Sequence, residues 1–370
     1  MKILIVSTFF PPLNSIASLR PFSWAKYWSM AGHDVSVLTT VKDEDSKTAL
    51  NFPNPGFRII EIPMPGFVSR LKKNQQSNEH QGNTQKGILS RFFDYLRFKK
   101  GVFNAARMPD LADLWAYKAY QAMKQQGEVW DLIISTAGPY SVHLVAHKLK
   151  KDRLGRRWIA DYRDTWSNNY IYPGLFPFNV FERWLERSIL KRADLVTTVS
   201  DPLANSLRLL FPGTSVETIA NGFDPEDLDH IDRAPIFFRD GKYRIVHTGS
   251  IYLEKRNPVP LFEAIRRLAL DPEKCCLLDK LEVLFVGPRQ ANLEDLISRF
   301  GVEKWVKLSG FVSRENALRM QRDAHALLFL AWNDPSVDGV LTGKIFEYLF
   351  AKTPIIAVGA VELEASQRLI

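Results

Sequence analysis

Short apolar runs alternate with amphipathic, helix-like segments along this chain, and the alternation occurs twice. Parallel strands that are covered by helices on both faces give continuous apolar runs rather than strict polar–apolar alternation. The pattern therefore predicts two α/β domains, each built on a doubly wound parallel sheet. In the first half the expected strands are 2–8, 34–40, 57–62, 131–136, 157–162, 195–200 and 216–221, and the expected helices are 17–31, 109–126, 139–151, 178–192 and 201–210.

A linker between the two domains is expected at 221–242, where Pro, Asp and Gly are frequent and the pattern has no steady period. A chain of 370 residues is also too long for a single hydrophobic core. We therefore expect one domain over 1–225 and a second over 240–370. The second half offers strands at 244–248, 282–286, 305–309, 325–331 and 354–359, and helices at 258–270, 291–300, 313–323 and 343–352.

The chain ends in ELEASQRLI, which reads as part of another helix. The doubly wound pattern would continue with a further strand and closing helices. The second domain is therefore predicted either to be truncated at its C-terminal end or to be unusually short.

The composition is that of a soluble protein, with 46% apolar and 24% charged residues. No run of 18 apolar residues occurs, so no transmembrane helix is expected. The two cysteines, Cys275 and Cys276, are adjacent and cannot join distant segments. This usage fits a reducing, cytoplasmic compartment.

Nearly the whole net charge of +8 comes from the segment 66–107, which has nine Lys and Arg against two acidic residues. One interpretation is a solvated insertion. The other is contact with anionic lipid at the inner face of the cell membrane, because ILSRFFDYLRFKK (88–100) mixes Phe with cations as an interfacial helix does. Nucleic-acid binding is not expected, because no recognition motif accompanies the charge.

In open parallel sheets ligands bind at the carboxyl ends of the strands, so the residues after each strand are candidates. After the first strand, Asn14 and Ser15 precede a helix start and either contact a ligand or belong to a plain loop. The loop has no G-x-G-x-x-G, which argues against a dinucleotide-dependent dehydrogenase. His143, near another helix start, is expected to be a polar core residue rather than a catalytic group.

The stretch DYRDTW (161–166) follows a strand and brings Asp161, Arg163 and Asp164 together at its end. These residues form either a structural ion-pair cluster or a cluster that contacts substrate. In the second case Asp164 and Asp161 are the candidate general bases.

The stretch HTGSIYLEKRNP (247–258) follows the first strand of the second domain. Gly249 permits a tight turn and a close approach of the backbone. Lys255 and Arg256 add two cations, and cations with helix N-termini hold a diphosphate without a metal. The alternative is an exposed basic turn.

A short amphipathic helix is expected in GVLTGKIFEYLFAKTPIIAVG (339–359). Thr342 can cap it, and Gly343 lets a phosphate approach the first N–H groups. Lys344 adds a full charge, while Glu347, one turn on, can accept hydrogen bonds from ribose hydroxyls. The alternative is a Lys–Glu surface pair. Backbone groups of Phe311 and Val312, after another strand, could contact a base.

These stretches together resemble the glycosyltransferase family 4 proteins, and the likeness covers most of the chain. It implies the GT-B architecture, in which two Rossmann-like domains face a cleft. It further implies retaining transfer of a sugar from a nucleotide-sugar bound by the second domain to an acceptor bound by the first, with no metal or other cofactor. The stretches are FFPP…AKYWSMAGHDVSVLTT, DYRDTW, ADLVTTVSDPLANSL, IANGFDP, TGSIY, LSGFVSRENALRMQRDAHALLF and GKIFEYLFAKTPIIAVG.

By resemblance, Glu347 matches the second of two family glutamates, which is expected on the ribose, and Arg256 matches one of two cations on the diphosphate. Gly339, beside Asp338, stands where the first glutamate is usual, and Ser250 where the other cation is usual. STAGPYS stands where the family has a His, and NSIA replaces the Gly-Gly of the first loop. A branch that builds envelope polysaccharides shares the Lys of K-x-F-E-Y and the Asp of R-D-x-W.

The leading hypothesis is a hexosyltransferase-like enzyme that acts on a cell-surface polysaccharide or lipid-linked acceptor. A nucleotide-sugar 2-epimerase would share the GT-B architecture, but it needs an acid–base pair that the sequence does not provide. A protein that binds nucleotide-sugar without turnover is the third alternative.

Overall fold

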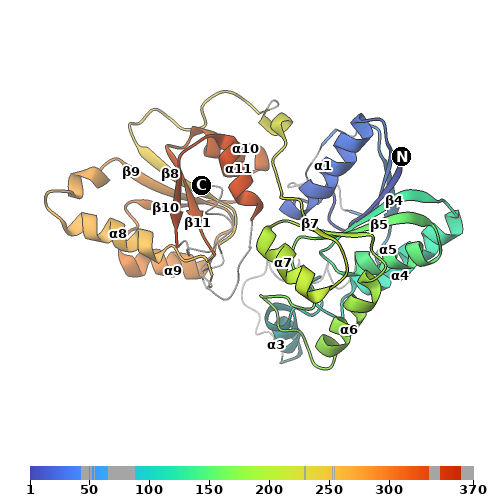
Figure 1. The fold of residues 1–370 in the computed structure, drawn as a ribbon. Coiled ribbons are helices and arrows are strands. Elements are labelled where there is room, and N and C mark those ends of the chain that lie inside the picture. The colour runs from blue at the N-terminus through green and yellow to red at the C-terminus, as the bar shows by residue number, and fades with distance from the viewer. Residues whose placement is uncertain are drawn as a thin grey trace. The chain divides into compact units, whose positions relative to one another are not determined.

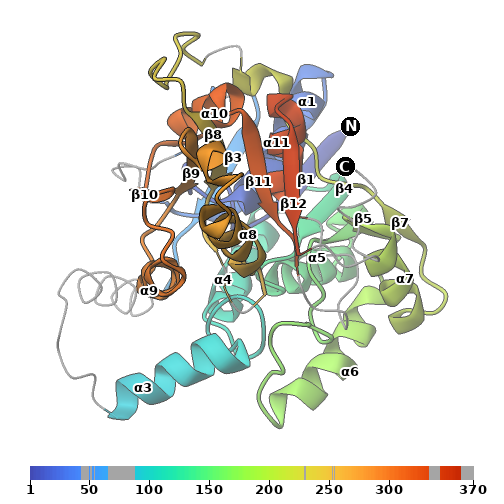
Figure 2. The same ribbon diagram turned by 90° about the vertical axis from the view of Figure 1, so that its left-hand side faces the viewer.

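The computed structural model describes residues 1–42, 50, 52–53, 55–65, 88–228, 231–251, 253, 255–332 and 342–359. The chain divides into two compact units, Met1–Ala220 and Asn221–Ile370. Each unit is built on a parallel sheet that is covered by helices (Figures 1 and 2). Among the described helices, none is long and apolar enough to cross a membrane.

The first unit contains a seven-stranded sheet in the order β3-β2-β1-β4-β5-β6-β7, and all of its strand pairs are parallel. Strand β1 pairs with β2 on one side and β4 on the other, so the topological switch point lies between β1 and β4. The strands are β1 (Lys2–Val6), β2 (Asp34–Thr40), β3 (Arg58–Ile62), β4 (Trp130–Thr136), β5 (Gly155–Tyr162), β6 (Leu195–Thr198) and β7 (Val216–Thr218).

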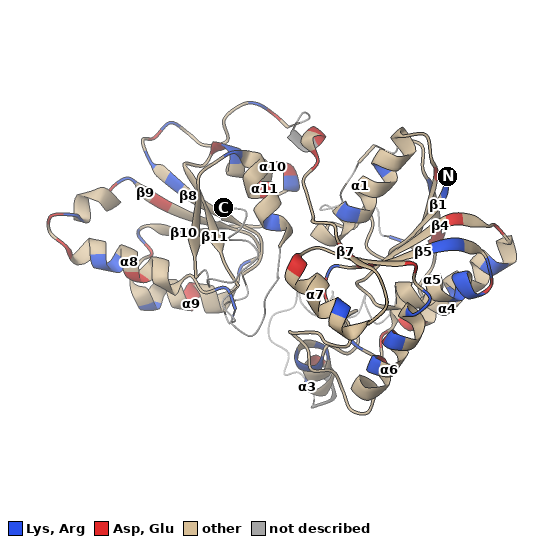
Figure 3. Cartoon of the chain, viewed as in Figure 1, with Lys and Arg blue, Asp and Glu red and all other residues tan. Residues whose placement is uncertain are grey.

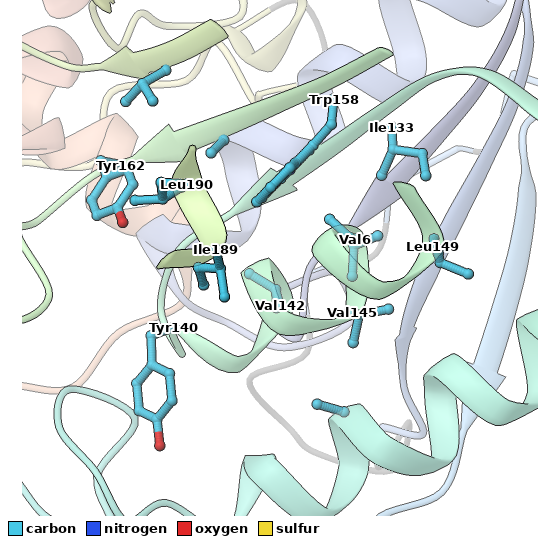
Figure 4. Packing of buried hydrophobic residues seen from close by; sticks show 14 of the residues in the cluster. Val6, Ile133, Tyr140, Val142, Val145, Leu149, Trp158, Tyr162, Ile189 and Leu190 are labelled. Atoms are coloured by element: carbon cyan, nitrogen blue, oxygen red, sulfur yellow. The ribbon is translucent and has the colours of Figure 1, made fainter. Parts of the chain in front are cut away.

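The helices of this unit pack on the two faces of the sheet. One core includes side chains of β1, β4, β5, α4, α5, α6 and α7, and Figure 4 shows Trp158 beside residues of α5 and α6. A smaller core packs α1 against β1 and β2. The helices are α1 (Ile16–Met30), α3 (Ile88–Tyr95), a π-helical turn (Leu96–Lys100), α4 (Ala112–Gln126), α5 (Ser141–Lys151), α6 (Phe178–Leu190) and α7 (Asp201–Leu210).

The second unit contains a five-stranded parallel sheet in the order β10-β9-β8-β11-β12. One core packs α8 and α9 against one face of the sheet. Another packs α11 against β8, β9 and β11, so both faces are again covered. The switch point lies between β8 and β11. The elements are β8 (Tyr243–Thr248), α8 (Val259–Leu270), β9 (Leu281–Val286), α9 (Ala291–Phe300), β10 (Val306–Gly310), α10 (Arg314–Asp323), β11 (Ala326–Leu330), α11 (Gly343–Ala351) and β12 (Ile355–Val358).

The predicted fold class, two doubly wound parallel sheets, is confirmed. The strand at 195–200 ends earlier than expected, at Thr198, because Ser200 is already the N-cap of α7. The segment 88–100 is helical, as the interfacial-helix interpretation requires, but its last turn is a π-helix. The expectation of a truncated C-terminal end concerns residues 360–370, which lie outside the described residues.

A buried carboxylate joins α6 to the loop that precedes α4. Glu182 accepts hydrogen bonds from Arg107, from the backbone N–H of Met108 and from Trp166 Nε1, and its Oε2 lies 2.7 Å from the Arg107 guanidinium. Both charged side chains are almost fully buried. Because both charged groups are shielded from solvent, water cannot solvate either one if the ion pair breaks. The ion pair therefore fixes the position of the loop.

We expect Glu182→Ala to lower the free energy of unfolding of the first unit by about 3–5 kcal/mol, because it leaves a buried guanidinium without its carboxylate. Urea unfolding followed by circular dichroism measures this. The neighbouring Arg183 is exposed, and Arg183→Ala is expected to change stability by less than about 0.5 kcal/mol. Equal stabilities of the two variants would contradict the role assigned to Glu182.

Candidate functional site

Two glycines shape the loops at the carboxyl ends of β8 and β9. Gly249 has a φ of +95°, which favours glycine, and its N–H donates to the carbonyl of Val286. A Cβ on Gly287 would lie 2.6 Å from the Gly249 carbonyl oxygen, so only glycine fits there. A Cβ on Gly249 would lie 3.5 Å from Lys344 Nζ. The β8 loop and the start of α11 are therefore in contact at this edge of the sheet.

Lys344, in the first turn of α11, is held by a buried histidine at the end of β8. Its Nζ lies 2.9 Å from His247 Nε2, and His247 Nδ1 lies 2.9 Å from the carbonyl oxygen of Leu328 on β11. A carbonyl only accepts, so Nδ1 carries the proton and Nε2 accepts from the Lys344 ammonium. Burial lowers the pKa of His247 well below its usual value, which keeps the ring neutral.

The surroundings of Lys344 disfavour its charged form. Desolvation and, to a smaller extent, the positive charge of Arg256 together lower the pKa of Lys344 to about 7, while Glu347 opposes both effects. Arg256 itself is only 8% exposed, with its guanidinium carbon 5.8 Å from the centre of the Trp332 ring. Two cations are thus confined near one strand end, an arrangement that suits an anionic ligand.

Glu347 and Lys344 do not form the surface pair that the sequence left open as an alternative. Glu347 accepts a hydrogen bond from Arg314 at the start of α10, and its other oxygen lies 3.4 Å from Gln321 Nε2. Glu347 is half-buried. Its carboxylate is therefore oriented by α10, while Lys344 is oriented by β8.

The expected cap of α11 is corrected by the structure. Thr342 occupies the N-cap position, but its hydroxyl makes no capping hydrogen bond. The Thr342 hydroxyl is buried and has no partner among the described residues. The helix begins at Gly343, as expected.

The remaining candidates of the second unit surround this point without forming a single cluster. Ser250 is exposed beside Gly249, and Lys255 is half-buried. Phe311 is exposed after β10, whereas Val312 packs against the core on the α11 side. Gly339 and Asp338 lie outside the described residues.

In the first unit, Asp161 has the environment of a structural ion pair. It is fully buried at the end of β5, and its oxygens accept from Arg20 at 2.8 and 3.1 Å. The hydroxyls of Thr136 and Thr197 each donate to it at 2.8 Å. These four hydrogen bonds join β4, β5, β6 and α1. The geometry favours the structural alternative for this residue.

Arg163 and Asp164 point to different surroundings. The Arg163 guanidinium donates to the backbone carbonyls of Ala137 and Ala17, so it links the loop after β4 to the first turn of α1. Asp164 is exposed and accepts a hydrogen bond of 2.9 Å from the Tyr170 hydroxyl. Asp161, Arg163 and Asp164 therefore make their hydrogen bonds in three different surroundings.

The other first-unit candidates take simple positions. Ser15 is the N-cap of α1 and accepts from the Ala17 N–H at 3.2 Å, while Asn14 is exposed. His143 is a buried core residue, as expected: its Nδ1 lies 2.7 Å from Ser135 Oγ, and burial lowers its pKa to about 3.

Sequence reasoning missed His247, Arg314 and Arg20. All three lie inside or beside quoted stretches, but their roles depend on partners far away in the sequence. Only the presence of a polar residue, His247, inside the apolar strand YRIVHT offered a signal.

Two doubly wound parallel sheets, with cations and a carboxylate at the strand ends of the second, define a GT-B-like α/β protein. The family model Glycosyltransferase Family 4 matches residues 22–227, more than half of the chain, and the chain belongs to that family. It is a glycosyltransferase that transfers a sugar from a nucleotide-sugar donor. No curated protein sequence matches the chain.

Solved structures share this fold at low sequence identity. Sucrose-phosphate synthase from Thermosynechococcus elongatus is 14% identical with a TM-score of 0.58, over 96% of this chain and 80% of that one. The catalytic domain of starch synthase IV from Arabidopsis thaliana, bound to ADP and acarbose, is 12% identical with a TM-score of 0.61, over 96% and 82%. The E. coli trehalose-6-phosphate structure bound with UDP-2-fluoro glucose is 13% identical with a TM-score of 0.57, over 96% and 84%.

We expect Asp161→Asn to lower the free energy of unfolding of the first unit by about 3 kcal/mol, because Arg20 keeps its buried charge and loses its anionic partner. Asp164→Asn, at an exposed position three residues away, is expected to stay within about 0.5 kcal/mol. Denaturant unfolding of both variants measures this. If Asp161→Asn were as stable as the wild type, the structural assignment of Asp161 would be wrong.

Proposed function

We propose that the second unit binds the donor diphosphate at the N-terminal end of α11 and the donor ribose at Glu347. The observation that carries this proposal is the position of Lys344 and Arg256 at one strand end, with Glu347 one turn further along α11. Two cations in a desolvated place repel each other, and a diphosphate would relieve that repulsion. The partial positive charge at the N-terminus of α11 acts in the same direction.

In the proposed reaction the bond between the anomeric carbon and the diphosphate oxygen breaks, and negative charge develops on the leaving diphosphate. Lys344 and Arg256 stabilise this charge, so the proposed transfer uses no metal. The anomeric carbon forms a new bond to an acceptor hydroxyl oxygen with retention of configuration, as the family resemblance implies, and the hydroxyl proton leaves. Gly249, Ser250 and Lys255 contribute the loop beside the diphosphate, and Phe311 and Val312 the contacts to the base.

We assign the acceptor to the first unit. The α1 loop with Asn14 and Ser15 is available to it, and Asp164 is the better candidate to receive the hydroxyl proton because it is exposed, whereas Asp161 is bonded to Arg20. Arg163 then has the role of holding the start of α1 against the loop after β4. The proposed acceptor is a cell-surface polysaccharide or a lipid-linked glycan.

A surface of the first unit supports a lipid-linked acceptor. The π-helical turn after α3 and the loop before α6 are joined by a hydrogen bond of 3.1 Å from the Gly174 N–H to the Lys100 carbonyl. The α3–α6 surface, as we define it, carries aromatic and basic side chains that are exposed or half-buried. Figure 3 marks the Lys and Arg positions on α3 and α6 in blue. The members of this surface are Phe92, Phe93, Phe98, Phe176, Phe181 and Trp184 together with Arg91, Arg97, Lys99, Lys100, Arg183 and Arg187.

We propose that this α3–α6 surface docks on an anionic membrane at its cytoplasmic face. Trp184 is 63% exposed and Phe98 59%, which is costly in water but favourable at the headgroup boundary. The basic side chains complement anionic headgroups. The part of the basic segment at 66–87 lies outside the described residues.

The donor site is tested by thermal unfolding with UDP, GDP, ADP, CMP and their sugar conjugates. A ligand at a hundred times its Kd adds about 2.7 kcal/mol to the stability of the folded state. We expect one nucleotide class to stabilise the protein. We further expect Glu347→Ala to weaken its binding by about 1–3 kcal/mol, because charge-assisted hydrogen bonds to the ribose are lost. Titration calorimetry measures this.

The matched control is Glu315→Ala, at an exposed position next to Arg314, which should bind like the wild type. Unchanged affinity of Glu347→Ala would refute the ribose role. Conversion of a nucleotide-sugar to its epimer without any acceptor would instead support the epimerase alternative.

Membrane docking is tested by flotation with vesicles that contain phosphatidylglycerol. We expect the double variant Phe181→Ser and Trp184→Ser to lose about tenfold in vesicle binding, because two exposed aromatic side chains no longer enter the interface. The control is Leu209→Ser on α7, where the leucine is even more exposed but lies outside the α3–α6 surface. Equal loss in both variants, or binding that salt does not weaken, would contradict the docking surface.

A further inference from the structure

The contact between His247 and Lys344 carries an inference that rests on the proposed donor site and extends it. His247 is fully buried on β8, with no exposure to solvent. Its two ring nitrogens have separate tasks: Nδ1 donates to the Leu328 carbonyl on β11, and Nε2 faces Lys344 Nζ at 2.9 Å. The backbone of the sheet therefore fixes both the orientation and the tautomer of the ring.

A neutral imidazole is an unusual partner for a lysine that also has a carboxylate on its own helix. Glu347 is bonded to Arg314, so Lys344 has no anion as its hydrogen-bond acceptor among the described residues. An anionic partner would neutralise the ammonium and compete with a ligand for it. A neutral acceptor holds the ammonium in place and leaves its full charge for the ligand.

We propose that His247 is a positioning residue, which keeps the Lys344 side chain charged and directed to the strand ends where the donor diphosphate binds. It does so without touching the donor, because its ring is enclosed between β8, β11 and Phe285. Gly249 lies beside the Lys344 ammonium, because a Cβ at this position would be in van der Waals contact with Lys344 Nζ.

The charges around Lys344 make the proposal sensitive to pH in a defined way. Arg256 from the β8 loop and Arg314 from α10 stay charged at all relevant pH values, and Glu347 on α11 pairs with Arg314. Tyr348 stays neutral because burial raises its pKa, and His247 stays neutral because burial lowers its pKa. Lys344, with a pKa of about 7, is the group of this set that changes its charge near neutrality.

Because a diphosphate binds the ammonium form, donor affinity should be highest below about pH 7 and fall as the pH rises through the pKa of Lys344. Removal of the Nε2 acceptor destabilises the ammonium in its desolvated site, so the pKa of Lys344 should fall. The affinity of such a variant should then drop at a lower pH than that of the wild type.

The first measurement is a titration of Lys344 in the donor-free protein, observed by NMR of lysine labelled with ¹³C at the ε position. The signal is assigned by its absence in Lys344→Arg. His247→Asn still donates to the Leu328 carbonyl but has no acceptor near Lys344, and His247→Gln can place its amide oxygen near the position of Nε2. We expect the Lys344 pKa to fall in His247→Asn and to stay close to the wild-type value in His247→Gln.

The second measurement is the affinity for whichever UDP-, GDP-, ADP- or CMP-sugar stabilises the protein, because the phosphate groups of these conjugates are esterified on both sides and do not titrate near neutrality. At about pH 7.5 we expect His247→Asn to bind about tenfold more weakly than wild type, the factor of one pKa unit. The gap should narrow to about twofold near pH 6, where lysine is mostly protonated in the wild type and about half protonated in the variant. Lys344→Arg should show no fall over this range, since arginine does not titrate there.

The outcomes separate the two proposals. If the Lys344 titration is the same in His247→Asn as in the wild type, the role of His247 is refuted, whatever the donor does. If the titration shifts but Lys344→Met binds the donor as tightly as the wild type, the role of Lys344 in the donor site is refuted instead. A loss of affinity in His247→Asn that is equal at every pH and is not restored by His247→Gln would indicate general damage to the fold and overturn the positioning role.

Discussion

The burial of parallel strands on both faces is the constraint on which the rest of this structure depends. Strands that are covered by helices must be apolar along their length, so polar chemistry is confined to the ends of the sheet. In the second unit this leaves Gly249, Lys344 and Arg256 at the carboxyl ends, and in the first unit it leaves the loops after β1 and β5. His247 in the second unit is a polar residue inside such a strand, and its two ring nitrogens each have a partner there.

The same constraint explains why charge at the strand ends is costly. Helix packing removes water from Lys344 while Arg256 lies near, and the resulting fall in the pKa of Lys344 is a measure of stability given up in the donor-free protein. A site that binds a diphosphate tightly needs this cost, because the ligand relieves it. In the first unit the charges Asp161–Arg20 and Glu182–Arg107 are instead satisfied within the fold, so they hold elements together and leave little to offer a ligand.

The sequence was sufficient for both sheets, because the central strands are apolar runs and most of the helices are amphipathic. The sequence was also sufficient to identify Lys344 and Glu347 as candidate ligand-binding residues on one helix. It was insufficient for their partners: the bonds from Lys344 to His247 and from Glu347 to Arg314 span 97 and 33 residues. Composition does not reveal which residues so far apart in the sequence are in contact, since the order of the strands in the sheet decides this. For the same reason DYRDTW looked like one cluster, although its residues point into different surroundings.

Two carboxylates illustrate what distinguishes a structural charge from a functional one. Asp161 and Glu347 each bond to an arginine from another element, and by residue type they are equivalent. Asp161 receives four hydrogen bonds and is closed to solvent, so its acceptor capacity is used within the protein. Glu347 is half-buried and has its hydrogen bonds on one side only, from α10. Acceptor capacity on the side of Glu347 away from α10, beside a confined pair of cations, is therefore the feature on which we base the proposal that the second unit binds the nucleotide.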